Sequence, residues 1–363
     1  MNDIVPSSRA STLVFFLIFL TIACSNEAER STEIIPEAAY GEINELAVIT
    51  DKRIWDGPVG DTLRYYYSAA YPILPKPEPT YDLRFFSVAD LNEAPLRKQM
   101  KHYLIIGNLN EADSPAGQLI RSDIGEEKVQ AAKTDLKMRA LAGRDKWAKG
   151  QVLIYHYAYS DGELIESIKN NFAASAKLFS QDNRPRIEAT TFLDGQMNGE
   201  LVEEVKNKMG AGLRIPGKYA KVVSNGELIW MRMENDSINS NLILCRVPYT
   251  SKKQLTRAGI KATRDNIGRK YIATTEANTY MRINDIDLPM FVLPATLNNN
   301  EALEARGIWE IANDNMGGPF ISYLIYNPEK KDLLFIDAFL HAPGKDKRDY
   351  MQQLEYIIAS VKY

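Results

Sequence analysis

The sequence predicts an α+β fold with two tandem two-layer α/β-sandwich-like domains, whose sheets are mainly antiparallel, after an N-terminal lipoprotein signal peptide. Three observations predict it: the length, the alternation of short apolar segments with amphipathic ones, and a hairpin-like strand pair. The chain has 363 residues, which is more than one hydrophobic core usually holds, so two domains are expected. The apolar fraction of 45% and the charged fraction of 25% match an ordinary globular protein.

Short segments rich in β-branched and aromatic residues are typical of strands. They lie at 46–50, 81–88, 102–108, 152–158, 221–223, 228–234, 242–247, 307–312, 320–326 and 333–341. Segments with apolar residues spaced by about 3.6 predict helices. They lie at 61–69, 126–142, 161–180, 200–209, 252–266 and 346–361.

Strand, cap and helix follow one another repeatedly, as where Ser160 separates the strand at 152–158 from the helix at 161–180. The segments at 320–326 and 333–341 are joined by a short polar turn, which favours antiparallel pairing. A polar, glycine-containing stretch at 193–199 separates the two predicted domains. The first is expected at 41–192 and the second at 200–363.

A segment typical of an export signal precedes the first domain. Residues 13–23 form an apolar run of about 11 residues, which is too short to cross a bilayer and fits a signal peptide. Ala23 precedes Cys24, and an apolar run that ends in a small residue and a cysteine resembles a lipobox. We therefore expect residues 1–23 to be cleaved, Cys24 to carry acyl chains such as palmitate, and 24–40 to be a flexible tether. A secretory signal cut elsewhere, or a buried first strand, is the alternative.

Charge and cysteine content limit the partners. Lys and Arg number 44 against 47 Asp and Glu, a net charge of −3, which gives no electrostatic footprint for nucleic acid. The expected partners are the lipid bilayer, through acylated Cys24, and an envelope protein. The second cysteine, Cys245, lies in an apolar strand segment, so we interpret it as a small buried apolar residue rather than a reactive thiol.

The first candidate for ligand binding is the segment from Trp55 to Asp61. Gly57 and Gly60 allow backbone conformations closed to other residues, and Asp56 and Asp61 supply carboxylates near a helix start. The structural alternative is a strand-to-helix turn in which Asp61 caps the helix and Trp55 packs over it.

The second candidate joins Arg306 and Trp309 to the pair Gly317 and Gly318. A Gly-Gly pair lets the backbone approach a ligand or another strand closely, so a tight bend is the alternative to a ligand-cradling loop. Arg306 is expected either to bind an anion or to pair with a carboxylate such as Glu304 or Glu310.

No motif for a metal, a cofactor or a catalytic group stands out in the sequence. His102, His156 and His341 are isolated, and no zinc, calcium or phosphate-loop pattern accompanies them. A Gly-x-Ser-x-Gly elbow is absent too. We assign no catalytic residue, no metal and no cofactor, and expect a protein that is not an enzyme.

Several motifs together resemble one family of Bacteroidota lipoproteins, the domain of unknown function 4837. They are 55–61, 74–79, 144–151, 183–184, 247–249, 264–266, 280–281, 306–309, 316–320, 347–348 and 354–355. The resemblance extends over residues 42–363. It implies a lipid-anchored envelope protein and no known reaction.

The expected function is therefore a binding or structural module, lipid-anchored in the cell envelope at the outer membrane, on its periplasmic or surface face. One alternative is an envelope hydrolase that uses carboxylates near Asp56 and Asp61, with Arg306. It requires these side chains to meet in one hollow. The other alternative is a subunit of an envelope assembly, which requires an exposed apolar patch.

Overall fold

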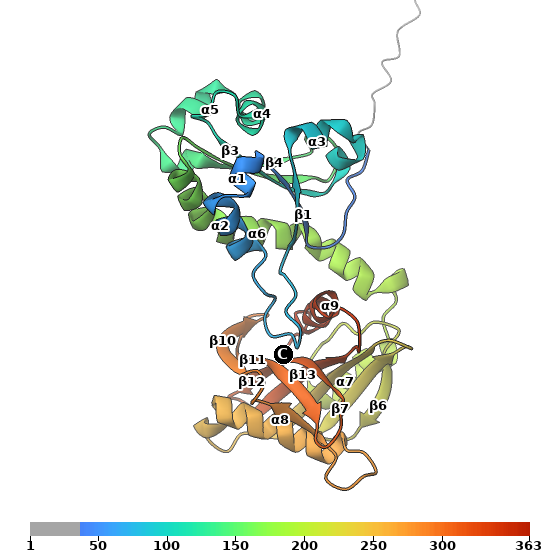
Figure 1. Cartoon of the computed structure of the whole chain (residues 1–363). Coiled ribbons are helices and arrows are strands. Elements are labelled where there is room, and N and C mark those ends of the chain that lie inside the picture. The colour runs from blue at the N-terminus through green and yellow to red at the C-terminus, as the bar shows by residue number, and fades with distance from the viewer. Residues whose placement is uncertain (1–36) are drawn as a thin grey trace, which may run out of the picture. The chain divides into compact units, whose positions relative to one another are not determined.

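The computed structural model describes residues 37–363, which form one compact unit (Figure 1). Cys24 and the predicted signal peptide lie outside these residues. Two β-sheets are present, and their strands come from separate stretches of the chain. Residues 37–192 are called the N-terminal half below, and 193–363 the C-terminal half. Among residues 37–363, no helix is long and apolar enough to cross a membrane.

The first sheet has five strands in the order β2-β1-β3-β5-β4. Strands β1, β2, β3 and β5 are parallel, and β4 is an antiparallel edge strand. The strands are β1 Glu45–Ile49, β2 Asp82–Phe86, β3 His102–Asn108, β4 Ala140–Arg144 and β5 Val152–Ala158.

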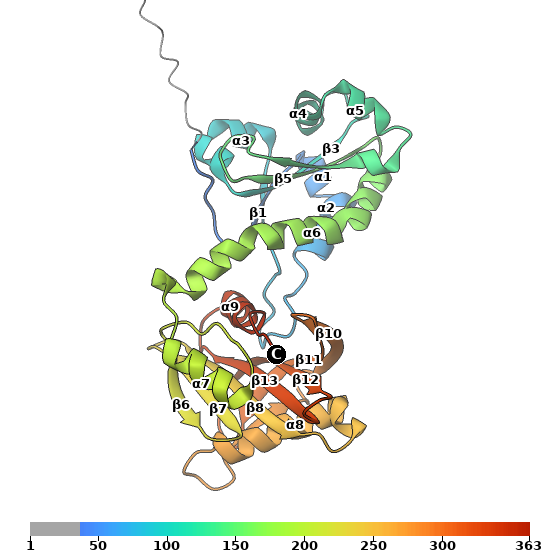
Figure 2. The ribbon, with the colours of Figure 1, turned by 180° about the vertical axis from the view of Figure 1, so that it is seen from behind.

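Helices cover both faces of this sheet (Figures 1 and 2). Leu63 of α2 and Leu164 of α6 belong to the core on one face, whereas Leu91 of α3, Ile120 of α4 and Val129 of α5 belong to the core on the other. The helices are α1 Lys52–Trp55, α2 Pro58–Tyr67, α3 Val88–Glu93, α4 Pro115–Ile124, α5 Glu126–Ala131 and α6 Asp161–Thr191.

The second sheet has eight strands, all antiparallel to their neighbours, in the order β10-β11-β12-β13-β8-β7-β6. The remaining strand, β9, pairs with the far end of β11. The strands are β6 Ala220–Ser224, β7 Leu228–Glu234, β8 Asn239–Pro248, β9 Met281–Asn284, β10 Phe291–Leu297, β11 Asn300–Ile311, β12 Gly317–Asn327 and β13 Asp332–His341.

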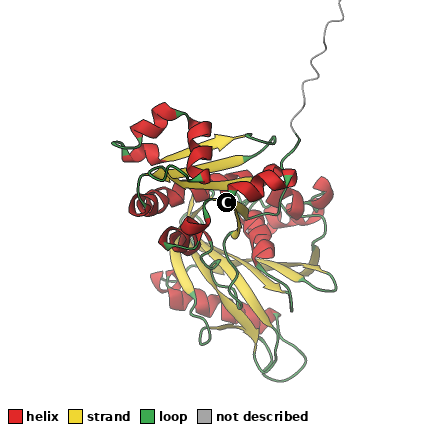
Figure 3. Ribbon diagram, turned by 45° about the horizontal axis from the view of Figure 1, so that its top comes forward, coloured by secondary structure: helices red, strands yellow, loops and turns green. Residues whose placement is uncertain are grey.

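Helices also cover both faces of the second sheet (Figure 3). Leu201 of α7 and Leu354 of α9 belong to the core on one face, and Ile260 of α8 belongs to the core on the other. The helices are α7 Gly199–Met209, α8 Arg257–Tyr271 and α9 Arg348–Ile358. Short 3₁₀ turns lie at Pro95–Gln99, Leu136–Arg139, Leu193–Gly195 and Lys252–Leu255.

The predicted α+β class is confirmed, but two of its details are corrected. The first sheet is largely parallel, because segments of a dozen residues or more that contain helices lead from β1 to β2, from β2 to β3 and from β3 to β5, as parallel pairing requires. Each sheet carries helices on two faces rather than one. Strands β3 and β5 are buried along their whole length, which is the pattern of strands covered on both sides. The predicted domain bounds at 41–192 and 200–363 stay a prediction.

The helix predicted at 126–142 is confirmed over 126–131 and is wrong beyond it. Helix α5 ends at Ala131, and the chain then enters the edge strand β4, in which Leu141 lies opposite Tyr155 of β5. Pairing with the sheet overrides the local helical spacing here. Strands β9 and β10 were not predicted; Pro294 within β10 hides the strand pattern, and an edge strand tolerates it.

Loop 68–81, between α2 and β2, contacts the C-terminal half at the start of α9. The Glu78 carboxylate accepts hydrogen bonds from the backbone N–H groups of Lys347 and Arg348, at 2.7 and 2.8 Å, where α9 begins. Arg348 in turn donates to Asp82 at 2.8 Å. A carboxylate at a helix N-terminus satisfies N–H groups that have no partner within the helix. This loop therefore fixes the start of α9 from the other half of the chain.

Candidate functional site

The first predicted site, at Trp55 to Asp61, is a compact turn between two helices. Pro58 is the first residue of α2, so Asp61 lies within the first turn. The expectation that Asp61 caps the helix is therefore wrong. A Cβ at Gly60 would lie 1.9 Å from the Trp55 carbonyl oxygen, so only glycine allows α1 and α2 to approach this closely. The Trp55 ring stacks on Phe85, with 5.2 Å between ring centroids.

Both carboxylates of this turn have local partners. Asp56 pairs with Lys52 at 2.7 Å, and Asp61 pairs with Arg64 at 2.8 Å. These are exposed pairs within single helical turns, which contribute little and need no ligand to explain them. The turn's residue types are thus accounted for by helix packing.

The residues of the second predicted site lie in two separate environments: Trp309 packs with the glycine pair, and Arg306 lies elsewhere. Trp309 lies opposite Gly318 on neighbouring strands, and its indole N–H donates to the Leu340 carbonyl at 3.3 Å. A Cβ at Gly318 would lie 1.9 Å from the same carbonyl oxygen, and a Cβ at Gly317 would lie 2.7 Å from that of Trp309. The glycine pair therefore allows the strands and the indole to pack closely, which is the structural alternative for this motif.

Arg306 lies in a different environment, a charged cluster that joins both halves. Its guanidinium donates to Glu304 at 2.6 Å and to Glu355 of α9 at 2.5 Å. Tyr71, from loop 68–81, donates to Glu355, and Tyr323 donates to Glu304. Burial alone would lower the pKa of Arg306, but the charge of Glu355 raises it above its ordinary value.

The predicted site residues thus do not meet in one hollow. Asp56 and Asp61 share no hydrogen-bond partner with Arg306, whose guanidinium is shared between two carboxylates. The ion pair expected between Arg306 and Glu304 is present. The alternative with Glu310 is not formed, because Glu310 pairs with Arg282 at 2.7 Å.

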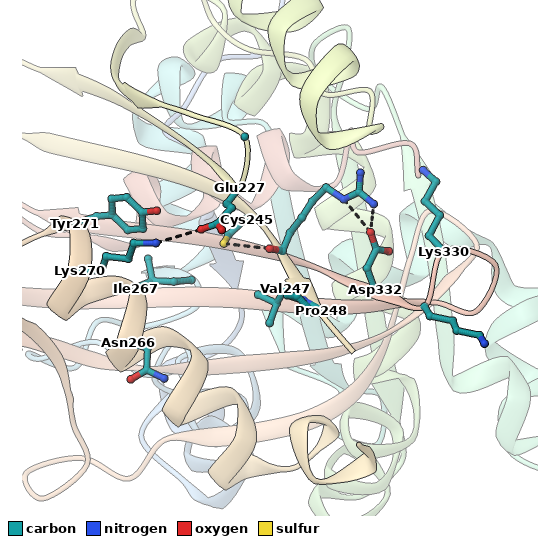
Figure 4. A pocket seen from close by; sticks show the side chains of 13 residues that line it. Glu227, Cys245, Val247, Pro248, Asn266, Ile267, Lys270, Tyr271, Lys330 and Asp332 are labelled. Atoms are coloured by element: carbon teal, nitrogen blue, oxygen red, sulfur yellow. Dashed lines mark hydrogen bonds and ion pairs between the residues drawn. The ribbon is translucent and has the colours of Figure 1, made fainter. Parts of the chain in front are cut away.

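The residue Cys245 borders a hollow of about 540 Å³ that sequence reasoning missed (Figure 4). On one side of it Lys270 pairs with Glu227 at 3.1 Å, and on the other Arg246 pairs with Asp332. Cys245 is 7% exposed, and burial raises the pKa of its thiol to about 11. A thiol held in its neutral form is a poor nucleophile, as expected of a small buried residue.

A second crevice lies at the carboxyl ends of the parallel strands of the first sheet. The chain after β1 passes to one face of the sheet and the chain after β3 to the other, so the connections diverge there. In open α/β sheets such a switch point is the usual place for a ligand. The hollow of about 490 Å³ there is lined by residues that include Asp51, Glu111 and Ser114.

The charged groups of this crevice hold one another. Asp51 accepts from the Ser114 hydroxyl and, at 3.2 Å, from a backbone N–H at the start of α4. Arg53 is held between Glu111 and Asp161, and its hydrogen bond lowers the pKa of Asp161. Because a carboxylate already occupies the N-terminus of α4, the place where this kind of fold binds phosphate is filled by the chain itself.

Exposed apolar side chains gather along the edge strand β10. Ile286 in the preceding turn is 91% exposed, Leu293 is 61% exposed and Phe291 is 49% exposed. Residues 288–300 carry no charged side chain. A groove of about 660 Å³, lined by residues that include Pro294 and Tyr326, adjoins the strand. Side chains alternate along a strand, so Phe291 and Leu293, which lie opposite Arg306 and Glu304 of β11, point to the other face of the sheet from Pro294, which lies opposite Leu303. We call Phe291, Leu293 and the groove, on the two sides of this edge strand, the β10 patch.

Little in the sequence marks these three places. Asp51 and Asp161 each follow an apolar strand closely, which would have suggested the crevice had the parallel strand order been known. The uncharged stretch at 288–300 was the available signal for the β10 patch. Among the described residues, no group of three or more His, Cys, Asp or Glu side chains is placed to hold a metal ion.

Comparisons with known proteins concern fold and family only. No curated protein matches the chain. Among solved structures, the Saccharomyces cerevisiae Ran-binding protein Mog1p is similar at 8% identity, over 42% of this chain and 89% of that chain, with a TM-score of 0.28. A Mog1 mutant is similar at 9% identity, over the same shares, with a TM-score of 0.27. Neither similarity bears on function.

Family models match both halves. Residues 39–191 match the domain of unknown function DUF8532, and residues 198–360 match the domain of unknown function DUF4837. The resemblance expected over 42–363 is thus divided, with a different family covering the first half. The family resemblance is thus confirmed for residues 198–360, which form a DUF4837 domain.

Proposed function

We propose that the protein is a lipid-anchored module of the cell envelope, held to the membrane by acylated Cys24, that binds a protein partner through the β10 patch. The anchor is supported by the apolar run at 13–23 and by the Ala23-Cys24 pair that ends it. Several acyl chains on one cysteine hold a protein firmly, because each buried CH₂ contributes about 0.8 kcal/mol.

Binding through β10 is supported by one observation above the others, the exposure of Phe291 and Leu293 on one side of an edge strand that carries no charged residue. Depletion of charge together with exposed aromatic side chains is typical of the core of a protein interface. Pro294 cannot donate a backbone hydrogen bond, so an added strand is a poor occupant for this edge. The partner we propose therefore packs apolar side chains against Phe291 and Leu293.

Binding is favoured over catalysis by the state of the charged groups. Arg306, Asp161 and Asp56 are each held in ion pairs. The carboxylate of Asp161 has a lowered pKa, so it stays ionised and cannot donate a proton near neutral pH. The hydrolase alternative would have been favoured by two neighbouring carboxyl groups, one with its pKa raised toward neutrality to act as an acid and one that stays ionised.

A photo-crosslinking experiment in native membranes tests the patch. A photoreactive residue replaces Leu293 in the full chain, and Leu136 serves as the matched control, since it is exposed to the same 61% in the other half. We expect a discrete crosslinked envelope protein from position 293 and none from position 136. Adding Phe291→Asp should abolish the crosslink, because a carboxylate in an apolar contact must lose its water.

The same crosslinking pattern at 293 and 136, or a crosslink at 293 that survives Phe291→Asp, would contradict binding through the β10 patch. The anchor is tested separately. Cys24→Ala should move the protein from the detergent phase to the aqueous phase, and an unchanged partition would contradict acylation.

A further inference from the structure

The described chain begins at a fixed place on the N-terminal half. The Lys149 N–H donates to the Glu37 carbonyl at 2.9 Å, and the Ala39 N–H donates back to the Lys149 carbonyl at 2.8 Å. The Tyr40 N–H donates to the Gln99 carbonyl at 2.8 Å. Residues 37–40 therefore lie between two loops at the amino ends of β3 and β5, and the chain that leads to Cys24 leaves from there.

Exposed apolar and aromatic side chains surround this exit. Leu96 is 63% exposed and Tyr40 is 48% exposed, and the Tyr40 hydroxyl donates to the Leu96 carbonyl at 3.0 Å. Pro95 beside them is exposed as well. Neither Lys98 nor Lys149 forms an ion pair with any side chain that the structure describes. We call these five residues the exit patch.

The length of the connecting segment limits how far this patch can lie from the anchor. Thirteen peptide steps separate Cys24 from Glu37, and fully extended they span at most about 45 Å. A site held this close to a surface meets it at a high effective concentration, in the millimolar range for short linkers. Even if the exit patch binds that surface weakly, it would then be bound most of the time.

We propose that the exit patch rests on the bilayer that holds the anchor, with Leu96 and Tyr40 in the headgroup region and Lys98 and Lys149 at lipid phosphates. This inference rests on the proposed acylation of Cys24. Tyrosine is enriched at membrane interfaces because its ring is apolar and its hydroxyl polar, and lysine reaches outward to headgroups. Each such lysine favours an anionic surface by about fivefold in affinity.

The arrangement also sets an orientation. Glu37, at the exit itself, is bound by the Gln99 amide, so its carboxylate already has a donor within the protein. The crevice formed by Asp51 and its neighbours lies at the opposite, carboxyl ends of the strands. With the amino ends of β3 and β5 on the membrane, that crevice faces away from it.

Fluorescence of a single labelled position tests the contact. The full acylated protein carries Leu96→Cys with an environment-sensitive fluorophore and is reconstituted into phosphatidylethanolamine–phosphatidylglycerol vesicles. Leu136→Cys is the control, because Leu136 is equally accessible but precedes β4, whose first residue lies opposite the carboxyl half of β5. Cys245 is buried and Cys24 acylated, so labelling is confined to the new thiol.

In the vesicle fraction isolated by flotation, the label at 96 should emit at shorter wavelength and be quenched several-fold more slowly by aqueous dithionite than the label at 136. Lys98→Glu with Lys149→Glu should reduce this protection when phosphatidylglycerol is present, and much less when it is replaced by phosphatidylcholine.

Equal quenching at 96 and 136 in floated vesicles would overturn the bilayer contact while leaving the anchor intact. Protein that fails to float would overturn the anchor and this inference with it. Protection at 96 in the Cys24→Ala protein without vesicles would mean that protein, not lipid, covers the patch, and would overturn the bilayer contact as well.

Discussion

The buried pair of Arg264 and Asp337 provides the sharpest prediction for the C-terminal half. Arg264 of α8 donates to Asp337 of β13 at 3.0 Å, and each side chain is 1% exposed. Ser322 donates to the same carboxylate oxygen at 2.6 Å, and the guanidinium carbon lies 3.9 Å from the Phe320 ring centroid. One nitrogen of Arg264 and one oxygen of Asp337 have no hydrogen-bond partner among the residues that the structure describes.

Removing one member of this pair should lower the free energy of unfolding much more than removing both. A single loss leaves an uncompensated buried charge, which costs about 3–5 kcal/mol, whereas replacing both by apolar residues of similar volume is often neutral. The two single variants should also differ. A carboxyl group can take up a proton when its partner is lost, but a guanidinium cannot release one.

We therefore expect Asp337→Leu to cost about 3–5 kcal/mol of unfolding free energy at any pH between 5 and 8. Arg264→Met should cost a similar amount at pH 8 and less at pH 5, and the double variant should lie within about 1 kcal/mol of the natural protein. Urea unfolding followed by tryptophan fluorescence measures all three. Single variants that each cost under about 1 kcal/mol, or a double variant worse than either, would refute the reasoning.

Three further predictions concern burial, backbone contact and the joint between the halves. His156 is fully buried, and burial lowers its pKa from 6.5 to about 4, so unfolding free energy should fall by about 3 kcal/mol as pH drops from 6.5 to 4; His156→Asn should remove that part, and an unchanged pH profile would contradict this. Gly318→Ala should cost at least about 1–3 kcal/mol, because its Cβ meets the Leu340 carbonyl, whereas Gly226→Ala, with nothing within 4 Å, should be neutral; equal midpoints in urea would count against it. Glu78→Gln weakens the acceptor of two N–H groups of α9 and should speed hydrogen exchange at its start; unchanged exchange there would show that the cap is dispensable.

Much of the fold is visible in the sequence where a strand is covered on both sides. The strands at 102–108, 152–158 and 228–234 were predicted to the residue, because long apolar runs end at polar turns. Parallel order was not predictable in this way, since pairing partners depend on where the helices cross. Strand β4 was missed because its only support is the neighbouring strand β5.

The candidate site was harder to predict than the fold. The Arg306 to Glu304 pair could be inferred from local spacing, but the contribution of Glu355 and Tyr71 depends on how the two halves pack. The same holds for the crevice, where Arg53 meets Asp161 across 108 positions of sequence. Chemistry assembled from distant segments leaves no local pattern to find.

The central claim, anchoring through Cys24, is tested most directly by mass spectrometry of the mature N-terminus. The first residue of the membrane-bound protein should be Cys24, with its mass raised by a thioether-linked diacylglycerol, and peptides from residues 1–23 should be absent. A mature protein that retains Met1, begins at another residue, or carries an unmodified thiol at position 24 would contradict it.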